Sequence, residues 1–316
     1  MINTEELKEK FSDRLEENVL LRDFTSIGVG GVADYFCRVS QVDEMVQLVS
    51  YLVKNEVPYF ILGGGYNLVF SDLGFPGFVI KNEIKDIVFS ADSAEVIVGS
   101  GVDISRLLMD AASRDLGGLE FLFGIPGTIG GAVYGNAGAF GRSIGDFIKS
   151  VTLLIPSEGG KGPKIVRHTQ KWLDFDNRSS HLKEYTKTHP MNPKPVILSV
   201  KLQLCQSKKD IILRKMQENL KVKKNSQPIS LKSAGCFFKN TGTQKEQSAG
   251  FLLDKSGAKK FHVGGASVSK LHANFLINSN KATAEDIRRL AGKMKEAVRA
   301  EFRVNLDEEI EYVGRW

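Results

Sequence analysis

The sequence predicts a protein of mixed helices and strands, in about two domains, whose backbone wraps a ligand. The chain has 316 residues, 42% of them hydrophobic, which is enough for a large core and about two domains. Apolar residues recur at the spacing typical of helices in some segments and at the spacing typical of strands in others, along the whole chain. Ten of its 31 glycines fall between Gly117 and Gly145. Because glycine has no Cβ, it lets another molecule approach the backbone closely, so this cluster indicates a ligand.

In the first half of the chain, stripes of apolar residues at helical spacing predict helices, and short apolar runs predict strands. Helices are expected over 5–15, over 43–55, where Met45, Leu48 and Leu52 share a face, and over 103–114, with Asp103 as N-cap. Strands are expected over 33–39, 59–62, 78–80, 87–90 and 96–98.

The second half yields strands over 150–155 and 195–205. In the latter, every second residue from Val196 to Leu204 is apolar, as in a half-buried strand. The stretch 181–195 contains three prolines and is expected to be a loop. A basic helix over 208–224 follows, then a helix over 284–300 with Thr283 as N-cap, and a last strand over 306–313. We place the main boundary near Gln206.

Charge and cysteine content exclude several classes of protein. The net charge of +6 is compatible with binding of small polyanions. The sequence contains no block of like charges of the kind that forms a nucleic-acid-binding tail. The three cysteines have no metal-type spacing, and His262 and His272 match none either, so we expect no metal. Neither a signal peptide nor a long apolar stretch is present, which predicts a cytoplasmic protein that does not enter a membrane.

Two glycine loops are candidate phosphate sites. Gly63, Gly64 and Gly65, followed by Tyr66 and Asn67, come directly after a predicted strand. Consecutive glycines can converge their N–H groups on an anion, although a tight turn between strands has the same pattern. The second loop is Ile125-Pro126-Gly127-Thr128-Ile129-Gly130-Gly131, and two such loops suit a dinucleotide. The Walker A motif and the strict G-x-G-x-x-G fingerprint are both absent.

Three side chains are candidates for chemistry. Cys236, in Ser233-Ala234-Gly235-Cys236-Phe237-Phe238, can act as an acid or be an inert small hydrophobe. Arg178 can hold a carboxylate through two hydrogen bonds or be a solvated surface residue. Glu309 lies on an acidic face of the last strand, which either faces a pocket or is simply exposed to water.

Six strings, in order, closely resemble the UDP-N-acetylenolpyruvoylglucosamine reductase (MurB) family. The resemblance covers 20–314, nearly the whole chain. The strings begin at Thr25 (TSIGVGGVAD), Gly63 (GGG), Gly124 (the glycine-rich segment), Ser233 (SAGCFFKN), Ser248 (SAGFLLD) and His272 (HANFLIN).

The resemblance implies an α+β protein with an FAD-binding fold of the vanillyl-alcohol oxidase (PCMH) type and a C-terminal α+β substrate-binding domain. Residues 1–205 would form the FAD-binding region, as two α+β subdomains, and 206–305 the substrate domain. Residues 306–316 would be a strand returning to the active site. The implied protein is a cytoplasmic, monomeric flavoprotein and oxidoreductase of peptidoglycan synthesis, and so of cell-wall biogenesis, cell shape, the cell cycle and cell division. NADPH would reduce the bound FAD, and the UDP-sugar enolpyruvyl substrate would then be reduced to UDP-N-acetylmuramate. An FAD-dependent oxidase of the same fold, acting on an alcohol or sugar, is the alternative.

The resemblance also implies roles for individual residues. Arg178 and Glu309 would polarise the substrate carboxylate. Cys236, where most members have serine, would protonate C2 after hydride arrives at C3. Because the pKa of a free thiol is about 8.5, a cysteine is intrinsically a stronger acid than the serine hydroxyl that it replaces. Arg178, Lys224, Asn240 and His272 would contact the substrate, with Lys223 the alternative to Lys224. The FAD-binding residues would be Gly63, Gly64, Gly65, Tyr66, Asn67, Gly127, Thr128, Gly130, Gly131, Asn136, Ala137 and Gly138. Tyr66 replaces the serine usual in the first loop.

Overall fold

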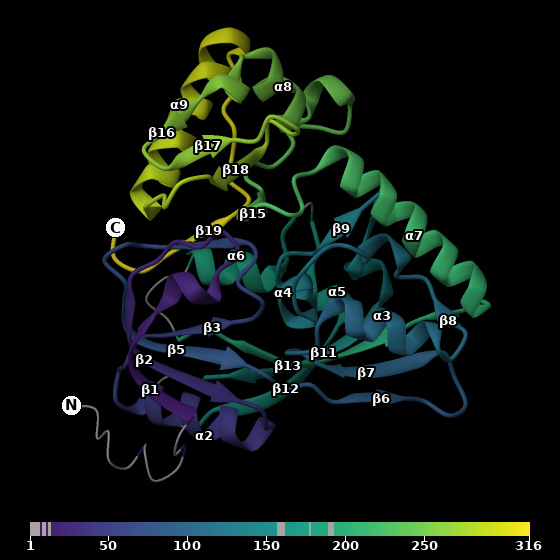
Figure 1. Cartoon of the computed structure of the whole chain (residues 1–316). Coiled ribbons are helices and arrows are strands. Elements are labelled where there is room, and N and C mark those ends of the chain that lie inside the picture. The colour runs from purple at the N-terminus through teal and green to yellow at the C-terminus, as the bar shows by residue number, and fades with distance from the viewer. Residues whose placement is uncertain (1–6, 8–10, 12–13, 157–161, 177, 189–192) are drawn as a thin grey trace. The chain divides into compact units, whose positions relative to one another are not determined.

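The computed structural model describes residue 7, residue 11 and residues 14–156, 162–176, 178–188 and 193–316 (Figure 1). The chain divides into two compact units, each made of three segments. Unit 1 contains Met1–Glu16, Tyr35–Gly64 and Gly77–Lys221, and unit 2 contains Glu17–Asp34, Gly65–Pro76 and Val222–Trp316. Two early segments of the chain therefore fold with its C-terminal part. Most of the helix predicted over 5–15 lies outside the described residues.

Unit 1 is built on a five-stranded antiparallel sheet of order β12-β11-β13-β7-β6. Figure 1 shows α3 and α4 on one face of this sheet, where they share its larger core cluster. The alternate residues predicted to be buried in β13, from Val196 to Leu202, are all buried. The strands are β3 (Tyr59–Leu62), β6 (Ile87–Phe89), β7 (Glu95–Gly99), β8 (Leu116–Gly117), β9 (Gly138–Ala139), β10 (Arg142–Ser143), β11 (Ile148–Ile155), β12 (Lys164–Thr169), β13 (Val196–Gln203) and β14 (Cys205–Gln206).

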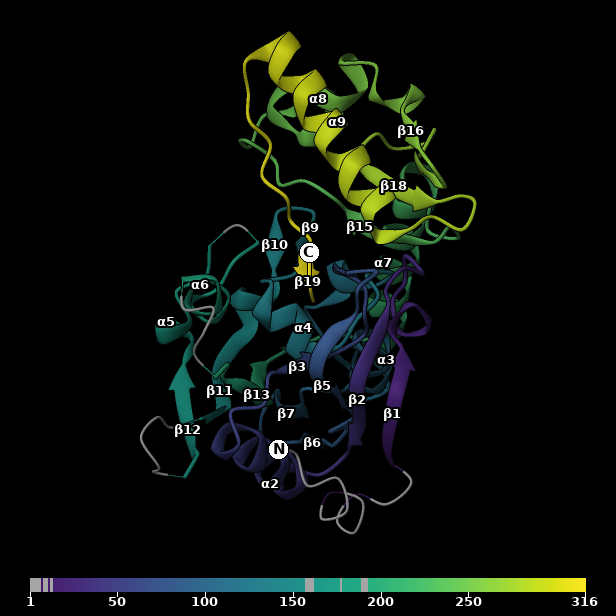
Figure 2. The same cartoon turned by 90° about the vertical axis from the view of Figure 1, so that its left-hand side faces the viewer.

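The helices of unit 1 in the described part of the chain are α2 (Val42–Lys54), α3 (Ile104–Ala112), α4 (Ile129–Tyr134), α5 (Gln170–Leu173) and α6 (His181–Thr188), and α7 (Lys209–Ser226) leads into unit 2. Three of them, α2, α3 and α7, lie where the sequence predicts helices, whereas no helix is predicted at α4, α5 or α6. Figure 2 shows α5 and α6 beside the end of β12. The loop predicted over 181–195 is wrong at its start, because α6 is helical with Leu182 and Thr186 buried. Asp103 precedes α3 as predicted, but its side chain makes no capping hydrogen bond.

Three strands run from one unit into the other along the chain: β1 (Leu15–Leu20), β2 (Val32–Val39) and β5 (Phe75–Asn82). They belong to a sheet of order β1-β2-β5-β3, in which β3 and β5 are parallel.

Unit 2 contains a four-stranded antiparallel sheet of order β15-β18-β17-β16 with α8 and α9 packed on one face. Its elements are β4 (Leu68–Phe70), β15 (Ser233–Cys236), α8 (Ala249–Lys255), β16 (His262–Val263), β17 (Ala266–Val268), β18 (Phe275–Asn278), α9 (Ala284–Phe302) and β19 (Glu311–Val313). The last strand is regular over three residues rather than over 306–313, and it pairs in parallel with β4.

The N-terminus of α9 is held from a distant part of unit 2. Thr283 caps it as predicted, its hydroxyl accepting from the Asp286 N–H at 3.0 Å. The Asp72 carboxylate also accepts from the N–H groups of Ala284 and Glu285, at 2.9 and 3.0 Å. Asp72 therefore joins the segment around β4 to the longest helix of the unit.

We expect Asp72→Ala to destabilise the protein by about 1 kcal/mol, because two first-turn N–H groups lose an anionic acceptor. Urea unfolding followed by circular dichroism measures this loss as a lower midpoint. Asp72→Asn, which keeps one acceptor oxygen, is the matched control and should lose less. An unchanged midpoint for Asp72→Ala would show that the cap contributes nothing.

Among the described residues, no helix combines the length and the apolar character needed to cross a bilayer. No cluster of three or more histidine, cysteine, aspartate or glutamate side chains within that part of the chain is arranged to hold a metal ion.

Candidate active site

The first glycine loop follows β3, as predicted, and passes from unit 1 into unit 2 after Gly64. A Cβ on Gly63 would lie 2.7 Å from the Thr128 hydroxyl oxygen, so any larger residue here would force Thr128 of the second loop to shift. The Lys81 ammonium group donates to the Gly63 carbonyl, and burial lowers its pKa. The start of the first loop therefore lies beside the second loop within unit 1, an arrangement that suits a clamp on a diphosphate.

On the unit 2 side, Gly65 has φ +74°, and a Cβ there would overlap the Phe24 carbonyl oxygen. The Asn67 carboxamide donates to the Glu309 carbonyl at 3.2 Å, whereas Tyr66 is 40% exposed. The Asn67 side chain therefore makes a hydrogen bond within the protein, in addition to its predicted contact with FAD.

The second glycine loop uses several of its own amides internally. Gly127 has φ +134°, and the Thr128 hydroxyl caps α4 by accepting from Gly131 N–H at 3.3 Å. The N–H groups of Ile129 and Gly130 donate to the carbonyls of Val102 and Ser100, at 2.9 and 2.8 Å. This loop therefore offers a phosphate fewer amides than its glycine content predicts.

Beyond α4, the predicted residues Asn136, Ala137 and Gly138 lead into the β9–β10 hairpin. Ala137 donates to the Ala132 carbonyl and accepts from Ile144 N–H, at 2.8 and 2.9 Å. At the tip of the hairpin, Phe140 is 51% exposed and has φ +54°, a conformation that is unfavourable for an aromatic residue. Phe140 is a candidate ligand contact that the sequence analysis missed, since neither exposure nor φ is visible in a sequence.

Arg178 lies on a tight turn between α5 and α6. Asp176 and Ser179 close this turn through two backbone hydrogen bonds of 3.2 and 3.1 Å, and Arg178 has φ +57°. Asn177, which lies between Asp176 and Arg178, is outside the described part of the chain. Such a conformation costs a non-glycine residue roughly 1 kcal/mol, so the surroundings must hold the turn in place.

Cys236 ends β15, beside the core of unit 2. It is partly exposed, whereas the next two residues, Phe237 and Phe238, are 0% and 1% exposed. The Asn274 carboxamide fixes this pair: it accepts from Phe238 N–H at 2.9 Å and donates to the Phe238 carbonyl at 2.8 Å. Gly235 has φ +87° and no atom within 4 Å of where a Cβ would be. The buried aromatic pair therefore anchors a more open segment that carries the thiol.

Glu309 is brought to the same part of unit 2 by backbone pairing. Its N–H donates to the Phe237 carbonyl at 2.8 Å, next to Cys236 in the chain, and its carbonyl accepts from Asn67. Lys239 N–H likewise donates to the Asp307 carbonyl at 2.8 Å. The C-terminal segment thus runs beside 237–239, and it places Glu309 near the Cys236 segment.

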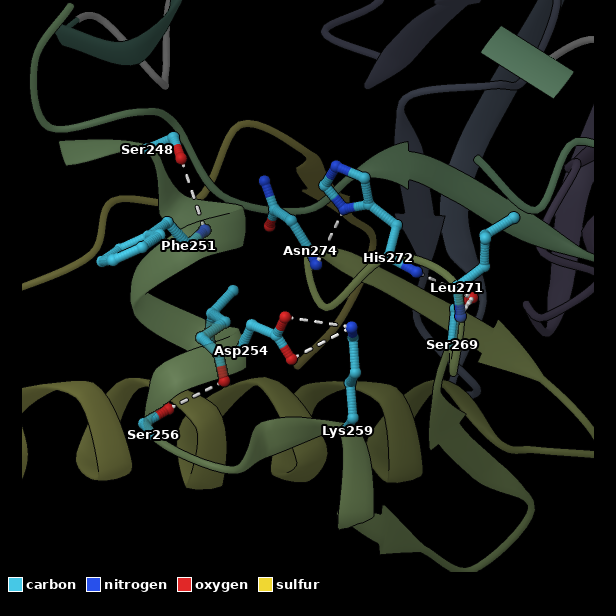
Figure 3. Close-up of polar contacts among 10 residues, drawn as sticks. Ser248, Phe251, Asp254, Ser256, Lys259, Ser269, Leu271, His272 and Asn274 are labelled. Atoms are coloured by element: carbon cyan, nitrogen blue, oxygen red, sulfur yellow. Dashed lines mark hydrogen bonds and ion pairs between the residues drawn. The ribbon is translucent and has the colours of Figure 1, made fainter. Parts of the chain in front are cut away.

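Asn240 and His272 are both fixed by hydrogen bonds within unit 2. The Asn240 carboxamide oxygen accepts from Ala249 N–H at 3.1 Å, at the start of α8. His272 Nδ1 accepts from Asn274 N–H at 3.2 Å (Figure 3). The neutral imidazole therefore carries its proton on Nε2, where it can be donated to a ligand. A Cβ on Gly250 would lie 2.9 Å from the His272 ring, which explains the small residue in α8.

Burial, together with the charge of Lys259, lowers the pKa of His272. In the unfolded chain His272 becomes protonated at about pH 6.5, whereas in the folded protein its protonation requires a lower pH. The protein therefore loses stability as the pH falls below about 6.5. We expect urea midpoints at about pH 7.5 and about pH 5.5 to differ more for the wild type than for His272→Gln. Equal differences would mean that His272 does not couple folding to pH.

Lys224 lines a groove of about 1010 Å³ within unit 2, whereas Lys223 is only 4% exposed. Lys259, Lys260 and Lys270 also line the groove, and no carboxylate does among its described lining residues. The apolar side chains of Ile229, Leu231 and Leu271, each about half exposed, complete it. Of the two lysines considered from the sequence, Lys224 lines this groove and Lys223 is buried.

The predicted site residues thus fall into two sets. Unit 1 holds Gly63, Gly64, Gly127, Thr128, Gly130, Gly131, Asn136, Ala137, Gly138 and Arg178, and unit 2 holds Gly65, Tyr66, Asn67, Lys224, Cys236, Asn240, His272 and Glu309. The structure brings Gly63 of the first loop beside Thr128 of the second within unit 1, and the backbone of Glu309 beside that of Phe237, the neighbour of Cys236, within unit 2.

Two family models match this chain, and several known proteins are similar to it over most of its length. A family model described as an FAD binding domain matches residues 33–159, and one for the C-terminal domain of UDP-N-acetylenolpyruvoylglucosamine reductase matches 227–313. The reductase of Protochlamydia amoebophila is 37% identical over 96% of this chain and 95% of its own, and that of Bacillus subtilis is 34% identical over 98% and 97%. The solved reductase (MurB) of Thermus caldophilus has a TM-score of 0.76 at 34% identity, covering 95% of this chain and 99% of its own.

Fold and site together define a flavin-dependent oxidoreductase with FAD as its cofactor. The predicted α+β, FAD-binding fold of the vanillyl-alcohol oxidase (PCMH) type is confirmed. The chain belongs to the UDP-N-acetylenolpyruvoylglucosamine reductase family, whose activity is that of a UDP-N-acetylmuramate dehydrogenase of peptidoglycan synthesis.

Proposed function

We propose that the protein uses NADPH to reduce the enolpyruvyl ether of UDP-N-acetylglucosamine to UDP-N-acetylmuramate. The observation that carries this proposal is the pairing of the C-terminal segment with 237–239, which puts a candidate acid and a carboxylate in one part of unit 2. Bound FAD would supply the hydride chemistry, taking hydride from NADPH and passing it to substrate C3. The domain boundaries predicted from the sequence, the monomeric state and the cytoplasmic location remain predictions.

The glycine loops would hold the FAD diphosphate. Gly63 leaves room where the Thr128 hydroxyl passes, and a larger residue would push the two loops apart. Because Ile129, Gly130 and Gly131 donate to protein oxygens, their part would be to shape the second loop rather than to bind phosphate.

Arg178 would bind the substrate carboxylate. Hydride arrival at C3 leaves an electron pair at C2 that delocalises into the adjacent carboxylate, so charge grows there in the transition state. A guanidinium ion stabilises this growing charge with two parallel hydrogen bonds. Glu309 would orient the polar groups at the reacting end of the substrate.

Cys236 would donate the proton that C2 needs. Transfer of the S–H proton to C2 completes the lactyl ether and leaves a thiolate, which solvent then reprotonates. A positioned acid of this kind contributes about 10²–10⁴-fold to a rate. The partly exposed position of Cys236, beside a buried aromatic pair, suits a group that must meet both substrate and water.

The nucleotide part of the substrate would meet Lys224, Asn240 and His272. Lys224 supplies positive charge at the groove, and the hydrogen bonds of the other two leave the Asn240 amide N–H₂ and His272 Nε2 as donors. Phosphate oxygens and uracil carbonyls are acceptors, which matches this set of donors.

Steady-state turnover tests this function. We expect sustained NADPH oxidation, beyond the one equivalent that reduces the bound flavin, only when the enolpyruvyl sugar nucleotide is present, with one UDP-N-acetylmuramate formed for each further NADPH consumed. Rapid consumption of oxygen with an alcohol or sugar, and none with the enolpyruvyl substrate, would instead establish an oxidase.

A further inference from the structure

The carboxamide of Asn136 joins the glycine-rich segment to the turn that carries Arg178. Its N–H₂ group donates to the Asp176 carbonyl at 3.0 Å, and its oxygen accepts from Gly145 N–H at 3.2 Å. Asn136 is only 7% exposed and has φ +44°. Both ends of the side chain are therefore engaged within unit 1, although the sequence predicts that it binds FAD.

A second contact joins the same segments, and a third joins the glycine-rich segment to α5, ahead of the turn. The Ser180 hydroxyl, 1% exposed, donates to the Tyr134 carbonyl at 2.8 Å. The Gln170 carboxamide donates to the Gly145 carbonyl at 3.1 Å. The turn is thus tied to the glycine-rich segment before Arg178, through Asp176, and after it, through Ser180.

The hydrogen bonds from Asn136 and Ser180 stabilise the turn in spite of the unfavourable backbone conformation of Arg178. Arg178 has the left-handed φ that a non-glycine residue avoids, and such a conformation persists only where its surroundings hold it. Removing the Asn136 donor would take away the side-chain hydrogen bond that fixes the Asp176 carbonyl, two residues before Arg178. The turn would then be free to relax, and misplacement of a catalytic group by about 1 Å can cost ~10²-fold in rate.

We infer that Asn136 is a positioning residue for Arg178: it holds the turn at the geometry in which the guanidinium meets the substrate carboxylate. The inference rests on the proposed role of Arg178. It assigns part of the glycine-rich segment to the half-reaction that consumes the enolpyruvyl substrate, rather than to FAD binding alone.

Asn136→Asp tests the inference selectively, because its carboxylate can still accept from Gly145 N–H but cannot donate to the Asp176 carbonyl. In anaerobic stopped-flow experiments, we expect flavin reoxidation by the enolpyruvyl substrate to slow by about 10–100-fold. Flavin reduction by NADPH and the FAD content should stay within about twofold of the wild type. Gln170→Ala is the matched control, since it removes a bond to Gly145 without touching Asp176, and it should leave both rates near the wild-type values.

A double-mutant cycle with Arg178→Ala separates this inference from the proposed function. If Asn136 acts through Arg178, then Asn136→Asp adds no further loss of rate when Arg178 is already alanine. Fully additive losses, lost FAD, equal slowing of both half-reactions or unchanged reoxidation would each overturn the inference. Reoxidation that is unaffected by Arg178→Ala alone would instead overturn the proposed role of Arg178. Asn136→Ser, whose hydroxyl is too short to reach both partners, replaces Asn136→Asp in the cycle if the latter does not fold.

Discussion

Arg178→Ala should slow reoxidation of the reduced flavin by the enolpyruvyl substrate by about 10²–10³-fold, because the charge that develops on the substrate carboxylate loses its counter-ion. Reduction of the flavin by NADPH should change little, since that step does not involve the carboxylate. Anaerobic stopped-flow absorbance at the flavin band measures the two rates separately.

Arg178→Lys is the matched control. Lysine keeps the positive charge but not the planar pair of donors, so its rate should lie between those of the wild type and the alanine variant. Equal slowing of the two half-reactions by Arg178→Ala would indicate a damaged FAD-binding region instead. A rate of reoxidation equal to that of the wild type would contradict the proposed role.

Cys236→Ala should slow formation of UDP-N-acetylmuramate by about 10²–10⁴-fold, because C2 then lacks a positioned proton donor. Cys236→Ser should retain substantial activity, since its hydroxyl is of similar size and also carries a transferable proton. Product formation under saturating NADPH and substrate measures both variants.

Cys205→Ser provides a control for the loss of a thiol, because Cys205 is exposed, lies in β14 of unit 1 and has no proposed role. Its turnover should match that of the wild type. If Cys236→Ala turned over as fast as the wild type, C2 would take its proton from another group. If Cys236→Ser were as slow as the alanine variant, the thiol would have a function that a hydroxyl cannot supply.

Regular elements could be predicted where local sequence decides them. In α9, an apolar stripe and a capping threonine act within a few residues, and the helix starts at the predicted residue. The sequence missed α6 because prolines at the end of 181–195 favoured a loop, although Leu182 and Thr186 bury one face of a helix. Asp103 has the right residue type and position for a cap, but its side chain makes no capping hydrogen bond, which a local pattern cannot show.

The site was predictable as a set of residues but not as a set of contacts. The resemblance points to Cys236 and Glu309, whereas their proximity depends on a backbone bond from Glu309 to Phe237, far apart in the sequence. Local patterns also cannot show that Asp72 caps α9 across 212 residues of chain. The sequence also does not show that the Gly130 amide, in a loop predicted to bind FAD, donates to the Ser100 carbonyl.

The two half-reactions are tested most directly by the visible spectrum of the purified protein under anaerobic conditions. The proposed function predicts an oxidised flavin spectrum that bleaches when NADPH is added. The spectrum should then recover when the enolpyruvyl sugar nucleotide is added, with UDP-N-acetylmuramate as the product. A flavin that NADPH bleaches but that the enolpyruvyl substrate cannot reoxidise would contradict the proposed reaction.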